Sequence, residues 1–258
     1  IVAGNDFDIW IYDIGRKTLS RLTFGGVNRS PAWSPDGKRG AYFSYDEGKN
    51  AIHIKQADGS GEPEKIFSAP LRMYLNSWTR DGKYLVVDRA TPKKASDVCL
   101  LPLGDPKDLV PLVSTQYDEY QSAISPDGRW LAHISNETGV FQVYVRKFPD
   151  GGGKWQISTD EGSEPRWSPD GRSLYYFSSG RFMAVNIEAA KTFKSGTPRV
   201  LFTGFRLLPV DSGLSYDITP DGRSIITTQS STGTESLTYI QVVFNFYTEL
   251  TKKSGGGR

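Results

Sequence analysis

The sequence predicts an all-β fold built from repeated units of four antiparallel strands, and three observations support this. A turn motif that reads SPDGK, TRDGK, SPDGR, SPDGR and TPDGR recurs at intervals of 45, 46, 43 and 51 residues. Short runs of β-forming residues lie between the motifs, and the chain contains 27 glycines, 15 prolines and 12% aromatic residues. This period is typical of a propeller blade. We therefore expect a six-bladed β-propeller of four-stranded antiparallel blades.

One repeat shows the expected order of elements. In residues 30–69, strands are predicted at SPAWS, KRGAYFSY, AIHIKQA and EKIFS, joined by PDG, DEGKN and DGSGEP. The preceding segment 8–24, DIWIYDIGRKTLSRLTF, has the pattern of the third and fourth strands of such a unit. Five complete motifs and this opening half predict six blades, of which the first is expected to be incomplete. The strand TYIQVVF near the end is a candidate to pair against the first blade.

The recurrent motif is interpreted as a structural turn rather than a catalytic site. Proline fixes φ, the aspartate can accept a hydrogen bond from the backbone two residues on, and glycine adopts the positive φ that closes the hairpin. Five catalytic aspartates would have to converge, whereas radial repetition separates equivalent positions. The predicted structural turn residues are Asp36, Gly37, Asp81, Gly82, Asp127, Gly128, Asp170, Gly171, Asp221 and Gly222.

A large apolar residue stands three positions before each turn aspartate. We expect these side chains to be buried where neighbouring blades meet, each tryptophan contributing about 2–3 kcal/mol from its buried area. The five residues are Trp33, Trp78, Ile124, Trp167 and Ile218.

Composition restricts the possible partners. The net charge of +2 gives no reason to expect nucleic acid, and no apolar stretch of twenty residues could insert into a membrane. Cys99 in DVCLLPL is expected to be a buried structural thiol. No secretory signal is visible, and the missing initiator methionine suggests a fragment of a larger protein.

The sequence lacks the common catalytic, nucleotide-binding and calcium-binding motifs, so we expect a non-enzymatic protein without a cofactor or a metal. G-x-S-x-G, the kinase motifs and an EF-hand loop are absent, and GGGK at 151–154 lacks the rest of a phosphate-binding loop. A sialidase box would have one residue between the aspartate and glycine of the turn. His53 and His133 are expected on strands of different blades, where they cannot form a local metal pair.

The repeats resemble those of the TolB-like, or PD40, β-propellers, a WD40-like family whose hallmark is W-S-P-D-G-[KR] followed by an A-F-x-S-like strand. The resemblance covers nearly the whole chain, and the ends are similar to propeller domains fused C-terminally to bacterial serine/threonine kinases or transcription regulators. It implies protein–protein interaction and often an extracytoplasmic, periplasmic or cell-surface, location. The organisation expected is one propeller domain over 1–250 and a flexible tail over 251–258.

Candidate binding residues lie in the segments that enter each inner strand, because these segments vary between copies and crowd one mouth of a propeller channel. Ordinary solvated loops are the alternative interpretation. Arg166 and Asp217 are also expected to meet as a structural ion pair. The insertion FRLLPVDS, 205–212, is a candidate lid or docking tip. The candidate residues are Arg29, Arg72, Tyr74, Asp118, Glu119, Tyr120, Glu161, Glu164, Arg166, Arg206 and Asp217.

The sequence therefore favours a binding module that presents the channel mouth to a protein, peptide or small ligand, as the sensor or scaffold part of a larger bacterial protein. One alternative is the substrate-gating propeller of a prolyl-oligopeptidase-type serine peptidase whose catalytic domain is not in this chain. Another is a lyase or glycosidase, which would need a metal or converging carboxylates and histidines.

Overall fold

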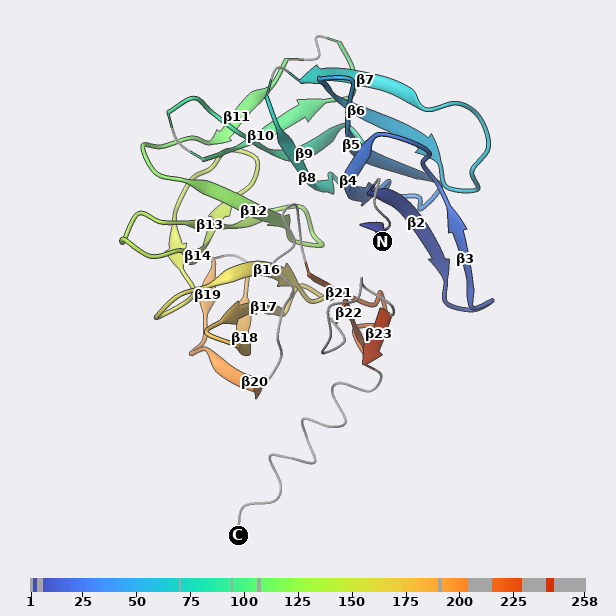
Figure 1. Ribbon diagram of the computed structural model, residues 1–258. Coiled ribbons are helices and arrows are strands. Elements are labelled where there is room, and N and C mark those ends of the chain that lie inside the picture. The colour runs from blue at the N-terminus through green and yellow to red at the C-terminus, as the bar shows by residue number, and fades with distance from the viewer. Residues whose placement is uncertain are drawn as a thin grey trace. The chain divides into compact units, whose positions relative to one another are not determined.

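The computed structural model describes residues 2–3, 7–69, 71–93, 95–105, 108–189, 192–203, 215–228 and 240–243 (Figure 1). Every regular element in these ranges is a β-strand, as the sequence predicts. Contacts divide the chain into two compact units, Ile1–Ser122 and Ala123–Arg258, called here the first and the second unit. The boundary falls inside β12. The expected tail and Arg206 lie outside the described residues.

The first unit contains three antiparallel sheets, whose strands follow one another in chain order. The first sheet has three described strands, as expected for an incomplete blade, and the next two have four each. The strands are β1 (Val2–Ala3), β2 (Asp8–Asp13) and β3 (Thr18–Arg21); β4 (Val27–Trp33), β5 (Arg39–Asp46), β6 (Lys49–Gln56) and β7 (Glu64–Ala69); β8 (Met73–Trp78), β9 (Tyr84–Arg89), β10 (Asp97–Pro102) and β11 (Val110–Val113).

The following sheet begins with β12 (Glu119–Ile124) and continues with β13 (Trp130–Ser135), β14 (Gln142–Lys147) and β15 (Trp155–Gln156). The next contains β16 (Ser163–Trp167), β17 (Ser173–Ser178), β18 (Arg181–Glu188), β19 (Lys194–Ser195) and β20 (Arg199–Thr203), where both β19 and β20 pair with β18. The last described sheet is β21 (Tyr216–Ile218), β22 (Ile225–Thr228) and β23 (Ile240–Val243). Strand β23 pairs with β22.

The five recurrent motifs share one turn geometry. In the second of them, Thr79 Oγ1 donates to Asp81 Oδ1 at 2.6 Å, and the same oxygen accepts the backbone N–H of Lys83 at 3.1 Å. Gly82 has φ 73°, which only glycine adopts without strain, and its N–H bonds the carbonyl of Thr79 at 2.9 Å. The hydroxyl–carboxylate bond recurs in the other four turns at 2.5–2.6 Å. These aspartates therefore close the hairpins between first and second strands.

Two of the three tryptophans before the turns are buried, and one is not. Trp78 and Trp167 are 8% and 7% exposed; Arg39 lies 5.3 Å from the Trp78 ring, and Trp167 Nε1 donates to the carbonyl of Ala123 at 3.1 Å. Trp33 is 54% exposed, so its expected burial is wrong. Arg39, at the start of β5, covers Trp78. The corresponding strand of the first sheet is β1, which has two residues, so the described part of that sheet has no equivalent segment to cover Trp33.

Candidate functional site

Three side chains in the first unit occupy one repeated position, seven residues before the turn aspartate. These are Arg29 on β4, Tyr74 on β8 and Tyr120 on β12, and all three are half-buried. They belong to the first strand of each sheet, the strand that borders the channel in propellers. We call Arg29, Tyr74 and Tyr120 the inner-edge cluster. Strands β4 and β8 lie side by side in Figure 1.

Cations and aromatic rings are paired at this edge. The Arg29 guanidinium lies 4.2 Å from the centre of the Phe7 ring, and Arg72 lies 4.9 Å from the Tyr74 ring. Phe7 is 41% exposed, and Arg72 is exposed. Stacking of this kind holds the exposed Arg72 side chain in place while its donors reach solvent, whereas Nε and Nη1 of Arg29 are buried. The sequence prediction included both arginines and Tyr74 but missed Phe7.

A buried carboxylate fixes the backbone behind the cluster. Asp88, on β9, accepts a hydrogen bond from Asn76 Nδ2 at 2.6 Å and another from the Gln121 N–H at 2.8 Å. Asn76 Nδ2 also donates to Ser122 Oγ at 2.9 Å. This bond connects β8 and β12, the first strands of the third and fourth sheets. Gln121 has φ 52°, a left-handed conformation that this bond stabilises. Sequence reasoning missed Asp88, because a buried strand aspartate has no distinctive local pattern.

The pKa of Tyr120, the residue before Gln121, is shifted by its surroundings. Burial raises the pKa of the Tyr120 hydroxyl, and Asp118 and Asp88 raise it further. Asp118 Oδ1 accepts the N–H of Ala95 at 2.7 Å, so this predicted binding residue also holds a neighbouring loop. Tyr120 therefore stays neutral near pH 7 and can both donate and accept hydrogen bonds.

Two of the predicted binding carboxylates are buried instead of facing a ligand. Glu119 is 1% exposed and accepts hydrogen bonds from the backbone and hydroxyl of Thr115. Glu164 is 7% exposed; its Oε2 accepts the Ser215 N–H at 2.6 Å, and its Oε1 accepts the Ser215 hydroxyl at 2.9 Å. Burial raises the pKa of Glu164. Both carboxylates stabilise loops within the chain.

The remaining predicted residues are more exposed. Glu161 Oε1 accepts the N–H and the hydroxyl of Ser179, each at 2.6 Å. Arg166 Nε lies 3.9 Å from Asp217 Oδ1, so the expected ion pair is present at the outer limit of such a contact. The Asp217 side chain is 77% exposed, which makes the pair weak.

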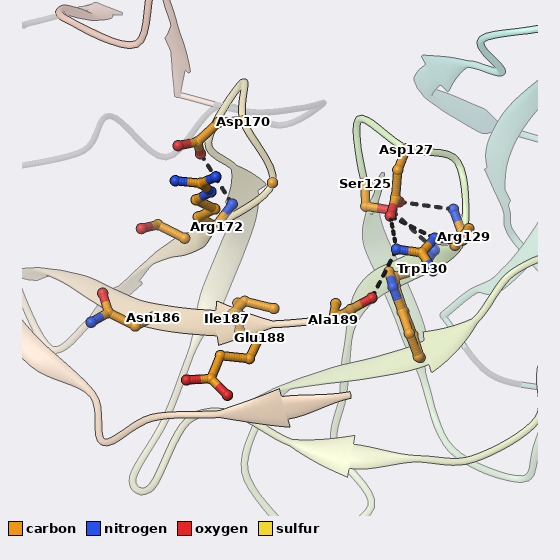
Figure 2. Close-up of a pocket in the computed structure, with 12 residues that line it drawn as sticks. Ser125, Asp127, Arg129, Trp130, Asp170, Arg172, Asn186, Ile187, Glu188 and Ala189 are labelled. Carbon is orange, nitrogen blue, oxygen red and sulfur yellow. Dashed lines mark hydrogen bonds and ion pairs between the residues drawn. The ribbon is translucent and has the colours of Figure 1, made fainter. Parts of the chain in front are cut away.

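The second unit also contains a hollow of about 730 Å³ beside two successive turns (Figure 2). Asp127 and Arg129 line it from one turn, and Asp170 and Arg172 line it from the next. The end of β18 forms the remaining wall. The repeated motif predicts a structural role for these turns, and no local pattern indicates that two of them border a cavity.

Neither a metal cluster nor a membrane-spanning helix occurs in the described part of the chain. No group of three or more His, Cys, Asp or Glu side chains there is arranged to hold a metal ion. None of the described residues forms a helix long and apolar enough to cross a membrane. His53 and His133 lie on β6 and β13, and Cys99 is buried on β10.

The repeated four-stranded meanders with one shared turn geometry define a β-propeller. The chain belongs to the TolB β-propeller domain family, PD40, whose family model matches residues 27–257. This agrees with the resemblance seen in the repeat motif.

Two curated proteins are similar to parts of this chain. An uncharacterised protein of Agrobacterium fabrum is 27% identical over 156 residues, which are 58% of this chain and 50% of that protein. The uncharacterised peptidase YuxL of Bacillus subtilis is 28% identical over 179 residues, which are 66% of this chain and 24% of that protein. The chain thus spans half, or less, of the length of these two relatives.

Solved structures show the same fold. TolB from Acinetobacter baumannii superposes with a TM-score of 0.71 at 18% identity, over 93% of this chain and 57% of that one. The periplasmic gluconolactonase PpgL of Pseudomonas aeruginosa superposes with a TM-score of 0.58 at 18% identity, over 86% of this chain and 71% of that one. At such identities the likeness concerns the fold alone.

Proposed function

We propose that this propeller is a non-enzymatic binding module that presents the inner-edge cluster of its first unit to a protein or peptide. The observation that carries the proposal is the repeated placement of Arg29, Tyr74 and Tyr120 at one position of three successive first strands. Tyrosine and arginine are enriched where protein interfaces have their largest energies. Their half-buried state and stacking reduce the entropy lost on binding.

Charge favours an acidic partner. The exposed guanidinium of Arg72 and the half-buried guanidinium of Arg29 lie at this edge, stacked on Tyr74 and Phe7. Of the nearby carboxylates, Asp88 is buried and accepts two hydrogen bonds from the chain, and the half-buried Asp118 accepts the Ala95 N–H. A peptide with carboxylates beside aromatic or aliphatic side chains therefore fits this surface.

The test is a screen of a displayed random-peptide library against the domain, followed by calorimetric titration of the enriched peptides. We expect acidic sequences to be enriched. The double variant Tyr74→Ala, Tyr120→Ala and the single variant Arg72→Ala should each weaken binding about tenfold or more, the typical effect at an interface hot spot.

The matched control is the double variant Tyr12→Ala, Arg16→Ala, which removes a tyrosine and an arginine exposed at the β2–β3 hairpin. It should bind as the unaltered domain does. Equal losses in the control and in the cluster variants, with all of them folded by circular dichroism, would reject this location. Enrichment of no sequence class would reject the proposal.

The proposal extends to the cellular setting of the domain. An extracytoplasmic location, with the domain as the sensor of a kinase-associated or regulator-associated protein, accords with the family and with the fold shared by a periplasmic gluconolactonase. Fusions of the natural full-length protein to alkaline phosphatase, which is active only outside the cytoplasm, test the location. Activity only in a cytoplasmic reporter fusion would exclude it.

A second candidate is the substrate-gating propeller of a serine peptidase, favoured by the similarity to the peptidase YuxL over 66% of this chain. Sequencing of the full reading frame decides between them: a G-x-S-x-G nucleophile elbow beside the propeller supports gating. Kinase or helix-turn-helix motifs in the same frame would instead support the binding module.

A further inference from the structure

The hollow in the second unit has chemistry of its own. Its walls come from three segments: the turn with Asp127 and Arg129, the turn with Asp170 and Arg172, and the strand end with Asn186 and Glu188 (Figure 2). All of these residues belong to the second unit. The volume of about 730 Å³ is in the range of small-molecule sites.

One wall is held rigid by internal bonds. Arg129 Nε donates to Asp127 Oδ2 at 2.7 Å, and Arg129 Nη2 donates to the carbonyl of Ala189 at 2.8 Å. The second bond connects the turn to the end of β18 (Figure 2). The charges of Asp127 and Arg129 therefore compensate each other, and the wall keeps its shape without a ligand.

The opposite wall offers groups that are not used within the chain. Among the described residues, the side chains of Arg172, Asn186 and Glu188 make no hydrogen bond or ion pair, and all three are exposed. Asp170 uses Oδ1 for the turn, where it accepts Ser168 Oγ at 2.6 Å. This wall thus presents donors and acceptors together: a guanidinium, an amide and carboxylate oxygens.

The indole N–H of Trp130 is a further donor beside the hollow, and it is buried. Trp130 lines the hollow and is 5% exposed, and its indole Nε1 has no hydrogen-bond partner among the described residues. Its ring packs against Trp155 and Phe193 at centroid distances of 5.5 and 5.0 Å, which fixes the direction of the N–H. A buried donor without a partner is costly, and a ligand oxygen would satisfy it.

We propose that this hollow binds a neutral, hydroxyl-rich ligand, a short saccharide. Arg129 and Asp127 neutralise each other, and Arg172 stands on the same turn as Asp170, which leaves the single carboxylate of Glu188 and little preference for a strongly charged ligand. The hollow presents both donors and acceptors, and a hydroxyl group both donates and accepts. The hydroxyl groups of a saccharide can therefore bond the exposed side chains of Arg172, Asn186 and Glu188. This site is independent of the inner-edge cluster.

The experiment is saturation-transfer NMR of the whole domain with cellobiose, maltose and N,N′-diacetylchitobiose, with affinities from titration. We expect at least one saccharide to bind. Arg172→Ala and Asn186→Ala should each weaken it about tenfold, the typical effect of losing a hydrogen bond to a charged or buried partner. Trp130→Phe keeps most of the ring and removes the N–H, and it should weaken binding in the same direction.

The matched control is Arg223→Ala, because Arg223 stands at the same turn position as Arg172 but does not line the hollow. Binding should be unchanged in that variant. Loss of binding in Arg223→Ala as large as in Arg172→Ala would overturn the assignment. So would the failure of all three saccharides, or preferential binding of inorganic phosphate or spermidine, which would assign the hollow to a charged ligand.

Discussion

Glu164 holds Ser215 by two hydrogen bonds at once: its Oε2 accepts the backbone N–H at 2.6 Å, and its Oε1 accepts the hydroxyl at 2.9 Å. The Tyr216 hydroxyl in turn donates to the Glu164 carbonyl at 2.8 Å. Strands β16 and β21 belong to consecutive sheets of the second unit, so these bonds connect neighbouring blades. Glu164 itself has φ 52°, a conformation that these bonds help to retain.

The first prediction concerns the strength of this connection. Glu164→Ala should lower the free energy of unfolding by about 2 kcal/mol or more, because the buried Ser215 N–H loses its acceptor. Glu161→Ala, which removes a more exposed glutamate three residues earlier, should cost clearly less. Urea unfolding measures both. Equal effects of the two substitutions would mean that burial of Glu164 adds nothing to its bonds.

The second prediction is the pH dependence of the same residue. Burial raises the pKa of Glu164 in the folded state, so the folded protein binds a proton more readily than the unfolded chain. This contribution to stability is full below the ordinary value of 4.5 and is lost as the pH rises through the folded pKa. Glu164→Gln should remove it. The unfolding midpoint of the unaltered domain, relative to that of Glu164→Gln, should therefore be higher at pH 4.5 than at pH 8.

The third prediction concerns His133, which is 1% exposed on β13. Burial, together with the smaller effects of the charges on Arg146 and Lys154, lowers the pKa of this imidazole from 6.5 to about 3. The unfolded chain therefore takes up a proton below pH 6.5 that the folded protein refuses. Stability should fall as the pH drops from 6.5 towards 3, by at most about 1.4 kcal/mol per pH unit from this residue.

His133→Gln should remove that slope in denaturant unfolding measured across the same pH range. His53, which is less buried and stacks on Tyr42 at 5.6 Å, provides the comparison, and His53→Gln should flatten the slope less. A slope unchanged by His133→Gln would show that the folded protein protonates this imidazole as readily as the unfolded chain does.

The fourth prediction separates the tryptophans. Trp78→Ala should cost about 3–5 kcal/mol, because it leaves a cavity in the core shared by the second and third sheets. Trp33→Ala should change the free energy of unfolding by less than about 1 kcal/mol, because Trp33 is 54% exposed. Urea unfolding of the two variants tests this. A large loss in Trp33→Ala would show that something covers this side chain in solution.

The fifth prediction concerns the turns. Hydrogen bonds from Thr79 and from the Lys83 N–H lower the pKa of Asp81, so its contribution is present above the ordinary value of 3.8 and is lost as the pH falls through the lowered pKa. Asp81→Ala should lower the thermal midpoint at pH 7, and the difference should shrink in acid. Lys83→Ala keeps the backbone N–H and should be nearly neutral. Equal melting of all three proteins would contradict a structural role for the carboxylate.

Local patterns were sufficient for the repeat and its turns. The order of residues in Thr79-Arg80-Asp81-Gly82 sets a hydroxyl, a carboxylate and a flexible backbone within one turn, so the geometry follows from neighbours in sequence. Sequence patterns predict the inner-edge cluster only in part. Arg29, Tyr74 and Tyr120 stand out as residues of variable segments, but their common position seven residues before the turn aspartate has no local signature. The buried, structural roles of Asp88 and Glu164 could not be recognised, because their partners Gln121 and Ser215 lie 33 and 51 residues away.

The sequence by itself determined the β-propeller, its repeated turns and the position of each first strand, because these depend on strand periodicity and on contacts within a few residues. Only the tertiary structure decided which charged groups face solvent and which are buried. It buried Glu119 and Glu164, left Trp33 exposed, and placed two turns beside the end of β18 to form a hollow. Burial and cavities depend on which distant segments pack together, and the residues of one segment do not carry that information.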